Sequence, residues 1–546
     1  MRHTSQVPDM VLTNGKFYTQ DLGTPTAEAI AIAGNRIMAM GSNKSINASA
    51  GPQTKQIDLE GRTGLPGMMD SHFHFHEWAF MRNQVDLAPV STFGECMSHL
   101  KAVAYNKKPG EWILGNGFNE SEWPENRKPL RSDLDLVSRD HPILVWRCDL
   151  HLAVANSNAL AIAGIDATTP DPPEGKIEKD KHGEPTGILR ELAINLAKIP
   201  ILALMDKSIV QAMREAMSGL NALGLTGIHD IRLMGGLEGA SALKAWQRLD
   251  SNGDMTLRSW VTVPGESIDE AITLGLTSGF GNDRLRLGHI KFFADGGMGA
   301  RTAYLLEPYL DAEYGMPLTP MVELEAAIKK ADENNLAVMI HGIGDRTNRE
   351  LVNLLEKTGT ESPQTDQTLG FGRSIPHRIE HLQMVRPEEI RRLAKMQRIV
   401  ACVQPHNAVL DINMIDQCVG ERGRYTYPFR DLLDAGVPLI FSSDCPVCDP
   451  SPLVGIHAAV TRQRADGTPE NGWYPKQKVT VEEAVYAYTQ APATAAGMGD
   501  HLGSITPGKF ADIVVLDRDI FAIPPQDILE TGVYMTLFDG QIVYQC

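Results

Sequence analysis

The chain has 546 residues, of which 42% are hydrophobic and 22% charged, and its formal net charge is −17. This acidic balance argues against nucleic acid and anionic membranes as partners. There is no apolar run of about 18 residues to predict a transmembrane helix, and the N-terminus lacks the apolar core of a secretory signal. The seven cysteines do not resemble a disulfide framework, so we expect a cytoplasmic protein.

The two ends of the chain share a β-rich pattern. Residues 1–62 contain short apolar segments broken by Asn14-Gly15 and Gly34-Asn35, dipeptides that are typical of hairpin turns. Residues 501–546 have the same texture. Because neither half alone has enough strands for a stable sheet, we predict that both ends combine into one small β-domain.

Between these ends, residues 63–500 alternate short apolar runs with helical patterns, which favours βα units and a parallel sheet. The predicted strands are Gly64–His72, Leu225–Asp230, Leu257–Val263, Leu285–Phe293, Leu336–Gly342, Ile375–His381, Ile399–Pro405 and Pro438–Asp444. Eight units favour an α/β fold, the (β/α)8 TIM barrel, in which chemistry lies at the C-terminal strand ends. A doubly wound sheet is the alternative, weakened because no G-x-G-x-x-G motif follows the first strand.

A long insertion, from about residue 75 to residue 220, follows the first barrel strand. It holds a Pro/Gly-rich stretch at Thr168–Gly175 and a predicted hairpin at Lys181–Gly187. Long ordered loops above a barrel usually shape the pocket. We therefore expect the insertion to supply part of the substrate site.

The first strand ends in His72-Phe-His74. Side chains at i and i+2 of a strand project from one face, about 7 Å apart along the strand, so both imidazoles can converge on one cation. Imidazole suits zinc, iron, cobalt or nickel. The motif predicts a metal site, although a lone H-x-H pair is commonly structural.

Later strands end in further residues of the ligating type. Lys291 lies in the fourth strand, His341 and His381 end the fifth and sixth, and Asp444 ends the eighth. Their joint placement indicates a catalytic centre more strongly than any member alone. Each also has a structural reading, as a core histidine or as a lysine neutralised by a carboxylate. His229 and His289 fit no ligand position, and we interpret them as structural or as supporting residues.

Several segments carry a family resemblance. They are Trp112–Glu120, His151–Leu160, Lys291–Ala303, His341–Asp345, Arg378–His381 and Ser443–Pro446. With these, nearly the whole chain resembles the amidohydrolase superfamily, and within it the YtcJ-like (amidohydrolase 3) group. That group includes N-substituted formamide deformylases and many members of unknown substrate.

The resemblance implies a site holding a divalent metal, Zn²⁺ in the first instance, with one or two ions per chain. Its ligands would be His72, His74, a carboxylated Lys291, His341, His381 and Asp444. Asp444 is the natural general base. His151 would contact the substrate carbonyl or oxyanion, with a capping or core role equally open. Asp295 and Arg301 are substrate-binding candidates, with a plain ion pair as the alternative.

The predicted function is hydrolysis of a C–N amide bond other than a peptide bond, in a small N-acyl or N-formyl amine. The expected partner is this small-molecule amide, and a homodimer is left open. One alternative is a deaminase of a cyclic amidine on the same fold. Such enzymes usually carry a glutamate three residues after the fifth-strand histidine, where this chain has Gly344. The other alternative is a non-catalytic binding protein.

Three further motifs are incomplete. Gly503–Phe510 resembles a phosphate-binding loop, but Phe510 replaces its Ser or Thr and a strand is expected to follow. Cys445 and Cys448 form a C-x-x-C pair without a thioredoxin context or a second cysteine pair, so pocket lining is expected. His76-Glu77 opens an H-E-x-x-H pattern, but its last position is Phe80.

Overall fold

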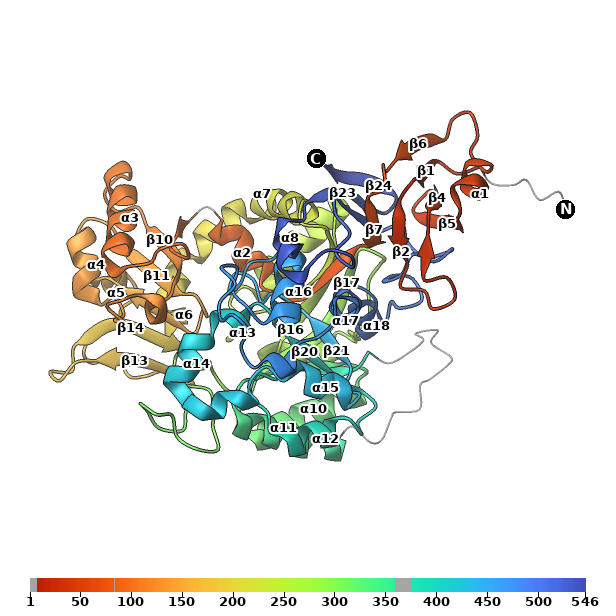
Figure 1. Cartoon of the computed structure of the whole chain (residues 1–546). Helices are drawn as coiled ribbons and strands as arrows, with labels where there is room; N and C mark the ends of the chain where they lie inside the picture. The colour runs from red at the N-terminus through yellow and green to blue at the C-terminus, as the bar shows by residue number, and fades with distance from the viewer. Residues whose placement is uncertain (1–6, 83, 359–374) are drawn as a thin grey trace.

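The computed structural model describes residues 7–82, 84–358 and 375–546, without the side chains of residues 203–207 and 358. The first six residues of the segment inspected for a secretory signal therefore lie outside the described residues. Figure 1 shows three parts side by side: a central barrel, the insertion on one flank, and the β-rich chain ends on the other.

Eight parallel strands follow one another around the central sheet in chain order. They are β8 (Met68–Phe73), β15 (Leu225–Asp230), β16 (Arg258–Pro264), β17 (Leu285–Phe293), β18 (Val338–Gly342), β19 (His377–His381), β20 (Ile399–Val403) and β21 (Leu439–Phe441). The first and last strands meet through a parallel bridge between Phe73 and Cys445. The Asp444 amide also donates to the His72 carbonyl at 2.8 Å. The predicted (β/α)8 barrel is confirmed.

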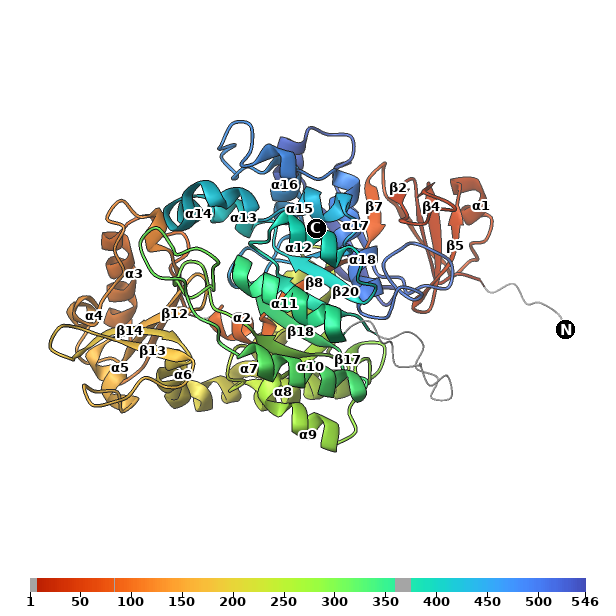
Figure 2. The ribbon, with the colours of Figure 1, turned by 90° about the horizontal axis from the view of Figure 1, so that it is seen from below.

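Helices surround the barrel and bury their apolar faces against it (Figure 2). Those on the barrel are α2 (Phe75–Met81), α7 (Leu202–Asn221), α8 (Gly239–Ser251), α9 (Ile268–Thr273), α10 (Met321–Glu333), α11 (Asp345–Thr358), α12 (Pro387–Leu393), α13 (Asn407–Leu410), α14 (Ile412–Val419), α15 (Phe429–Asp434), α16 (Pro452–Thr461), α17 (Val481–Tyr488) and α18 (Gln490–Ala495). Helices cover the outer face of the barrel strands, and the packed interior of the barrel covers their inner face. This burial on both faces explains the continuous apolar runs in the sequence.

The chain ends form two small sheets. One joins both ends in the order β24 (Gln541–Gln545), β23 (Val533–Phe538), β22 (Ile513–Leu516), β7 (Thr63–Pro66), β2 (Lys16–Tyr18) and β3 (Thr26–Ala27). The other is β5 (Arg36–Gly41), β4 (Ala29–Ala33), β1 (Met10–Thr13) and β6 (Lys55–Asp58), beside α1 (Asn43–Asn47). The N-terminal half thus builds a four-stranded sheet alone, which corrects the expectation that it could not.

The first predicted strand is in fact two strands, divided at Gly67. Before it, β7 pairs with β22 of the small domain, and after it, β8 pairs with β15 of the barrel. A Cβ atom at Gly67 would lie 2.2 Å from Oγ1 of Thr226, so the close crossing requires glycine. The apolar pattern continues through Gly67, so the sequence did not indicate that the chain changes from one sheet to the other there.

The insertion is a unit with its own six-stranded sheet and two apolar cores. Its strands are β13 (Gly175–Lys179), β14 (Pro185–Glu191), β12 (Leu152–Ala155), β11 (Ile143–Arg147), β10 (Ile113–Phe118) and β9 (Val85–Asp86). Its helices are α3 (Phe93–Asn106), α4 (Arg131–Val137), α5 (Ser157–Ile162) and α6 (Ala193–Lys198). The predicted hairpin is confirmed as the β13–β14 pair.

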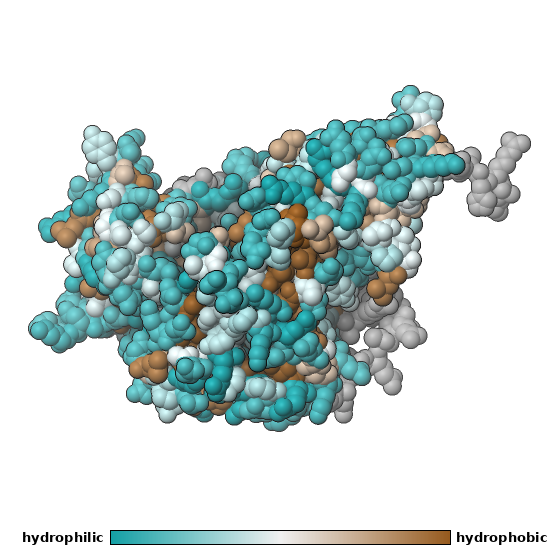
Figure 3. Space-filling model, in the orientation of Figure 1, coloured by the Kyte–Doolittle hydropathy of each residue, from teal (hydrophilic) through white to brown (hydrophobic). Residues whose placement is uncertain are grey.

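The face of the molecule seen in Figure 3 is mainly hydrophilic, with apolar side chains gathered in small patches. In the described residues, the helices lack the combination of length and apolar character needed to span a membrane.

An ion pair joins the barrel to the small β-domain and gives a stability prediction. The guanidinium of Arg258, which is 1% exposed, contacts Asp512 at 2.7 and 2.9 Å and also pairs with Asp539. We expect Arg258→Met to destabilise the fold by about 3–5 kcal/mol, because it leaves the buried Asp512 carboxylate without a counter-charge. Thermal unfolding of the whole chain measures this as a lower midpoint.

Arg284→Met is the matched control for this prediction. Arg284 also pairs with Asp539, at 2.8 Å, but its side chain is 41% exposed. Exposed pairs contribute about 1 kcal/mol or less, so its loss should be small. Equal shifts in the two variants would show that burial of the Arg258 pair does not matter.

Candidate metal centre and substrate cavity

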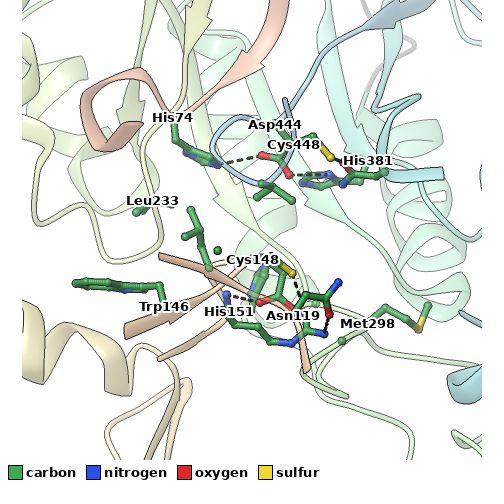
Figure 4. A pocket seen from close by; sticks show the side chains of 18 of the residues that line it. His74, Asn119, Trp146, Cys148, His151, Leu233, Met298, His381, Asp444 and Cys448 are labelled. Atoms are coloured by element: carbon green, nitrogen blue, oxygen red, sulfur yellow. Dashed lines mark hydrogen bonds and ion pairs between the residues drawn. The ribbon is translucent and has the colours of Figure 1, made fainter. Parts of the chain in front are cut away.

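A cavity of about 360 Å³ lies between the C-terminal ends of the barrel strands and the insertion. Figure 4 shows His74, His381 and Asp444 of the barrel on one side of it, and His151, Trp146 and Asn119 of the insertion on the other. All six predicted metal ligands and His151 line this cavity. The barrel and the insertion therefore supply opposite walls of one site.

His72, His74 and Asp444 form the tightest group. Oδ1 of Asp444 lies 3.4 Å from Nε2 of His72 and 3.2 Å from Nε2 of His74. One nitrogen or oxygen atom from each of the three lies within 4.8 Å of the others. The three side chains are buried, and such a set of donors has the spacing needed to surround a single cation.

The other two histidines complete the ring of imidazoles. The ring centre of His381 lies 5.0 Å from that of His72 and 4.5 Å from that of His341. Burial lowers the pKa of His72 to about 4 and that of His381 to about 3. Both rings are therefore neutral near pH 7, which is the form that binds metals.

Two of these residues have an unusual backbone. His381 has φ of 69° and Asp444 has φ of 60°, in the left-handed region that non-glycine residues rarely occupy. Such conformations cost on the order of 1–3 kcal/mol each and gather at functional sites. At His381 the left-handed turn ends β19, so that both Glu380 and His381 contact His72 although they are consecutive.

Lys291 is 2% exposed, and its Nζ atom has no hydrogen-bond partner among the described residues. Burial lowers the pKa of the Lys291 ammonium to about 8, although Glu380 and Asp444 oppose this shift. The unprotonated fraction of this amine near neutral pH is consequently larger than that of an ordinary lysine, although the ammonium form still dominates. Lys291 thus has the burial and the lowered pKa that the sequence interpretation required of it.

Each of three histidines is oriented by a contact at Nδ1. His72 contacts the Glu380 carboxylate, His74 donates to the Ile231 carbonyl at 3.1 Å, and His381 donates to Oε1 of Gln404 at 2.9 Å. Their Nε2 atoms are left for a ligand in the cavity, as is usual for metal-binding histidines. Glu380 is in turn held by the Arg378 guanidinium at 2.8 and 2.9 Å.

Sequence reasoning did not assign roles to Glu380 or Gln404. Glu380 stood inside the Arg378–His381 segment, but regular strand alternation would have directed its side chain away from that of His381. Gln404 follows β20 with no motif around it. The useful signal would have been a polar residue beside a predicted metal ligand, either in the same strand or at the end of the neighbouring strand.

The donor set fits a zinc-type cation. Neutral imidazoles and a carboxylate are suitable ligands, and two buried atoms in the cavity, Nζ of Lys291 and Oδ1 of Asp444, have no hydrogen-bond partner among the described residues. Burial opposes ionisation of Asp444, but the imidazoles of His72, His74 and His381 hold the pKa of its carboxyl group below the usual value.

His151 lies across the cavity from Asp444 (Figure 4). Its Nδ1 is 2.7 Å from Oε2 of Glu191, and its ring centre is 5.3 Å from that of His341. Burial opposes a charge on His151, but the Glu191 carboxylate raises the pKa of the imidazole to about 9. The insertion therefore presents a cationic ring to the metal side of the cavity.

Asp295 and Arg301 do not line this cavity. Asp295 accepts hydrogen bonds from the amides of Tyr304, Ile343 and Gly344 at 2.8–3.0 Å. Arg301 pairs with Asp311 at 2.7 Å, the alternative left open from the sequence. Their contact with substrate stays a prediction.

Residues that the sequence analysis did not assign to the metal site make contacts elsewhere in the structure. His229 accepts a hydrogen bond from Arg378 at 2.7 Å, and Nε2 of His289 lies 3.0 Å from the Pro376 carbonyl. Neither lines the cavity, whereas Cys448 does. The loop at Gly503–Phe510 leads into strand β22, in keeping with its interpretation as the start of a hairpin rather than a phosphate site.

Comparison with known proteins agrees with this architecture. A model described as "Amidohydrolase family" matches residues 55–544. Among solved structures, an uncharacterized metal-dependent hydrolase from Pyrococcus horikoshii OT3 is 27% identical with a TM-score of 0.74, over 94% of this chain and 99% of that one.

Three curated proteins are similar over almost their full lengths. Protein LONG AFTER FAR-RED 3 of Arabidopsis thaliana is 32% identical over 98% of this chain and 92% of its own length. Putative amidohydrolase YtcJ of Bacillus subtilis is 30% identical, covering 97% and 98%. N-substituted formamide deformylase of Arthrobacter pascens is 29% identical, covering 99% of both chains.

Proposed function

This chain belongs to the amidohydrolase family, and from that premise we propose that it hydrolyses a linear, non-peptide amide with the help of a zinc-type centre. The proposed substrate is a small N-formyl or N-acyl amine, and the products are a carboxylate and an amine. The observation that carries the proposal is the meeting of four histidines, Lys291 and Asp444 in one cavity.

The proposed metal ligands are His72, His74, Lys291, His341, His381 and Asp444. A bound divalent cation would supply Lewis acidity, which acidifies water and polarises the scissile carbonyl. Lys291 would enter this set as a carbamate: its neutral amine would add to CO₂ and release one proton, which would supply two oxygen donors for the metal. Its burial and its lowered pKa support this assignment.

Asp444 is the proposed proton carrier. The surrounding imidazoles keep its carboxylate ionised, which is the form that accepts a proton. As water attacks the carbonyl carbon, Asp444 accepts the water proton and then passes it to the amine nitrogen, so that the C–N bond breaks with a neutral leaving group. Positioned proton transfer of this kind contributes about 10²–10⁴-fold in rate.

His151 is the proposed contact for the substrate carbonyl oxygen. It faces the metal side from the insertion and is held by Glu191. A donor placed where negative charge develops stabilises the transition state more than the bound substrate. In this proposal the barrel wall of the cavity supplies the proton carrier, Asp444, and the insertion wall supplies the residue that stabilises negative charge, His151.

The size of the cavity and one relative support a small substrate. A volume of about 360 Å³ lies at the lower end of the range for small-molecule sites. The relative named N-substituted formamide deformylase aligns over 99% of both chains. For these reasons we place the formyl or short acyl group at the metal side and the amine substituent along the insertion.

The lack of space for a side chain at position 344 disfavours the deaminase alternative. A Cβ atom there would lie 2.0 Å from the backbone oxygen of Tyr304, so a glutamate at this position would require the loop to move. The glutamate expected of a deaminase therefore has no room in this loop. The binding-protein alternative would predict that a ligand residue is missing, whereas all six proposed ligand residues line the cavity.

Metal removal tests the proposal. Treatment with a chelator should abolish hydrolysis of N-formyl and N-acetyl amines, and added Zn²⁺ with bicarbonate should restore it. Inductively coupled plasma mass spectrometry of the active protein should find one or two metal equivalents per chain. Full activity in metal-free protein would contradict the proposal, as would ammonia release from aminopurines in place of amide hydrolysis.

A further inference from the structure

Glu191 is a buried carboxylate that does not itself touch the substrate in the proposed mechanism. It ends strand β14 of the insertion and is 4% exposed. Its Oε2 lies 2.7 Å from Nδ1 of His151, and its Oε1 accepts a hydrogen bond from the Thr302 hydroxyl at 2.5 Å. Glu191 therefore ties His151 to the loop that follows strand β17, the strand that carries Lys291.

The contact with Glu191 decides which nitrogen of His151 is available. Because Nδ1 is used by Glu191, Nε2 is the nitrogen left for a ligand, and it has no hydrogen-bond partner among the described residues. The Asp149 carboxylate accepts from the His151 amide at 3.1 Å, which fixes the backbone as well. Figure 4 places the ring on the insertion side of the cavity, opposite Asp444.

The loop after β17 closes around this pair. A Cβ atom at Gly297 would lie 2.9 Å from the His151 ring, and one at Gly296 would lie 2.4 Å from Oε1 of Glu191. The Gly297 amide donates to Oγ1 of Thr302 at 3.0 Å. This fit leaves the imidazole little room to rotate.

We propose that Glu191 is the positioning residue for carbonyl recognition, because it fixes the orientation of His151 so that Nε2 points at the oxygen of the bound amide. The inference rests on the proposed amide hydrolysis. The Glu191 carboxylate accepts the hydrogen bond from Nδ1 of His151, which fixes the plane of the ring and the direction in which Nε2 points. In this arrangement the insertion shapes the cavity and also contributes to the chemistry.

Glu191→Gln tests the inference, since it keeps the size of the side chain and removes its charge. We expect kcat to fall by about 10–100-fold, with KM and metal content within about twofold of wild type. Glu178→Gln is the matched control: it is the same change on neighbouring strand β13, where Glu178 pairs with Arg190 at 3.0 Å outside the cavity lining. Equal activities of both variants and wild type would overturn the inference.

A double-mutant cycle separates positioning from general support of the fold. If Glu191 acts through His151, then Glu191→Gln should change kcat less than about twofold in a His151→Gln background. If it lowers kcat there as much as in the wild type, the positioning assignment is wrong. Thr302→Val keeps the Glu191–His151 contact and removes the bonds that the Thr302 hydroxyl makes to Oε1 of Glu191 and to the Gly297 amide, so it should give a smaller loss of kcat.

Nuclear magnetic resonance of ¹⁵N-histidine-labelled protein gives a readout that does not need turnover. The Nδ1 proton of His151 should give a hydrogen-bonded signal in wild type and in Glu178→Gln, and should lose it in Glu191→Gln. An unchanged signal in Glu191→Gln overturns the inference even if amide hydrolysis is found. If wild type hydrolyses no amide, the proposed function fails, and carbonyl recognition by His151 fails with it.

Discussion

Replacing Asp444 by asparagine is expected to lower kcat by about 10²–10⁴-fold while the bound metal is retained. The carboxylate lies 3.2 and 3.4 Å from the imidazoles of His74 and His72, and an amide oxygen can occupy the same place. An amide cannot accept and return a proton, so the loss should fall on kcat. Steady-state kinetics with an N-formyl amine, beside metal analysis of the same sample, measures both quantities.

Asp449→Asn is the control for this change. Asp449 lies in the same loop but is exposed, and it accepts a hydrogen bond from the Ser451 amide at 2.8 Å. Its replacement should leave kcat and metal content unaltered. A kcat of Asp444→Asn near that of wild type would remove Asp444 from the mechanism. Loss of metal together with activity would assign it a ligating role alone.

The barrel, and the gathering of the predicted ligand side chains at one end of it, could be predicted from the sequence. In a parallel barrel the strands are continuous apolar runs, and the ligands stand where those runs stop. Strands β15 and β17 therefore begin and end at the predicted residues. His72, His341 and His381 meet because strand ends in a closed sheet face a common centre.

The insertion side could not be predicted in the same way. His151 and Glu191 are 40 residues apart and lie at the ends of two neighbouring antiparallel strands, so no spacing rule connects them. The pairing of Arg301 with Asp311 depends on a loop conformation, and the change of sheet at Gly67 depends on a close contact with Thr226. Contacts between irregular segments leave no periodic pattern in the sequence.

Lys291→Met is expected to reduce both metal content and activity, and it tests the least ordinary part of the proposed centre. Lys291 is 2% exposed and its ammonium has no hydrogen-bond partner among the described residues. A purely structural lysine at this depth should be paired with a carboxylate, since an isolated buried charge is costly. A carbamate resolves this, because its two oxygens would be neutralised by the cations that they bind.

Methionine fills similar space but cannot take up CO₂. We expect Lys291→Met to lose about one metal equivalent per chain and to lower kcat by about 10²-fold or more. Lys509→Met is the matched control: the Lys509 ammonium is half-buried and bonds the carbonyls of Gly499 and Leu502 at 2.6 and 2.9 Å, outside the cavity lining. Its metal content and kcat should match those of wild type.

Bicarbonate distinguishes a carbamate from a plain amine at this position. Metal-free wild-type protein should regain activity with Zn²⁺ faster and more completely when bicarbonate is present, whereas Lys291→Met should show no such dependence. With ¹³C-labelled bicarbonate, a carbamate carbon signal should appear in the wild type alone. Recovery that is independent of bicarbonate, together with full metal loading of Lys291→Met, would leave the imidazoles and Asp444 as the whole ligand set and limit the centre to a single cation.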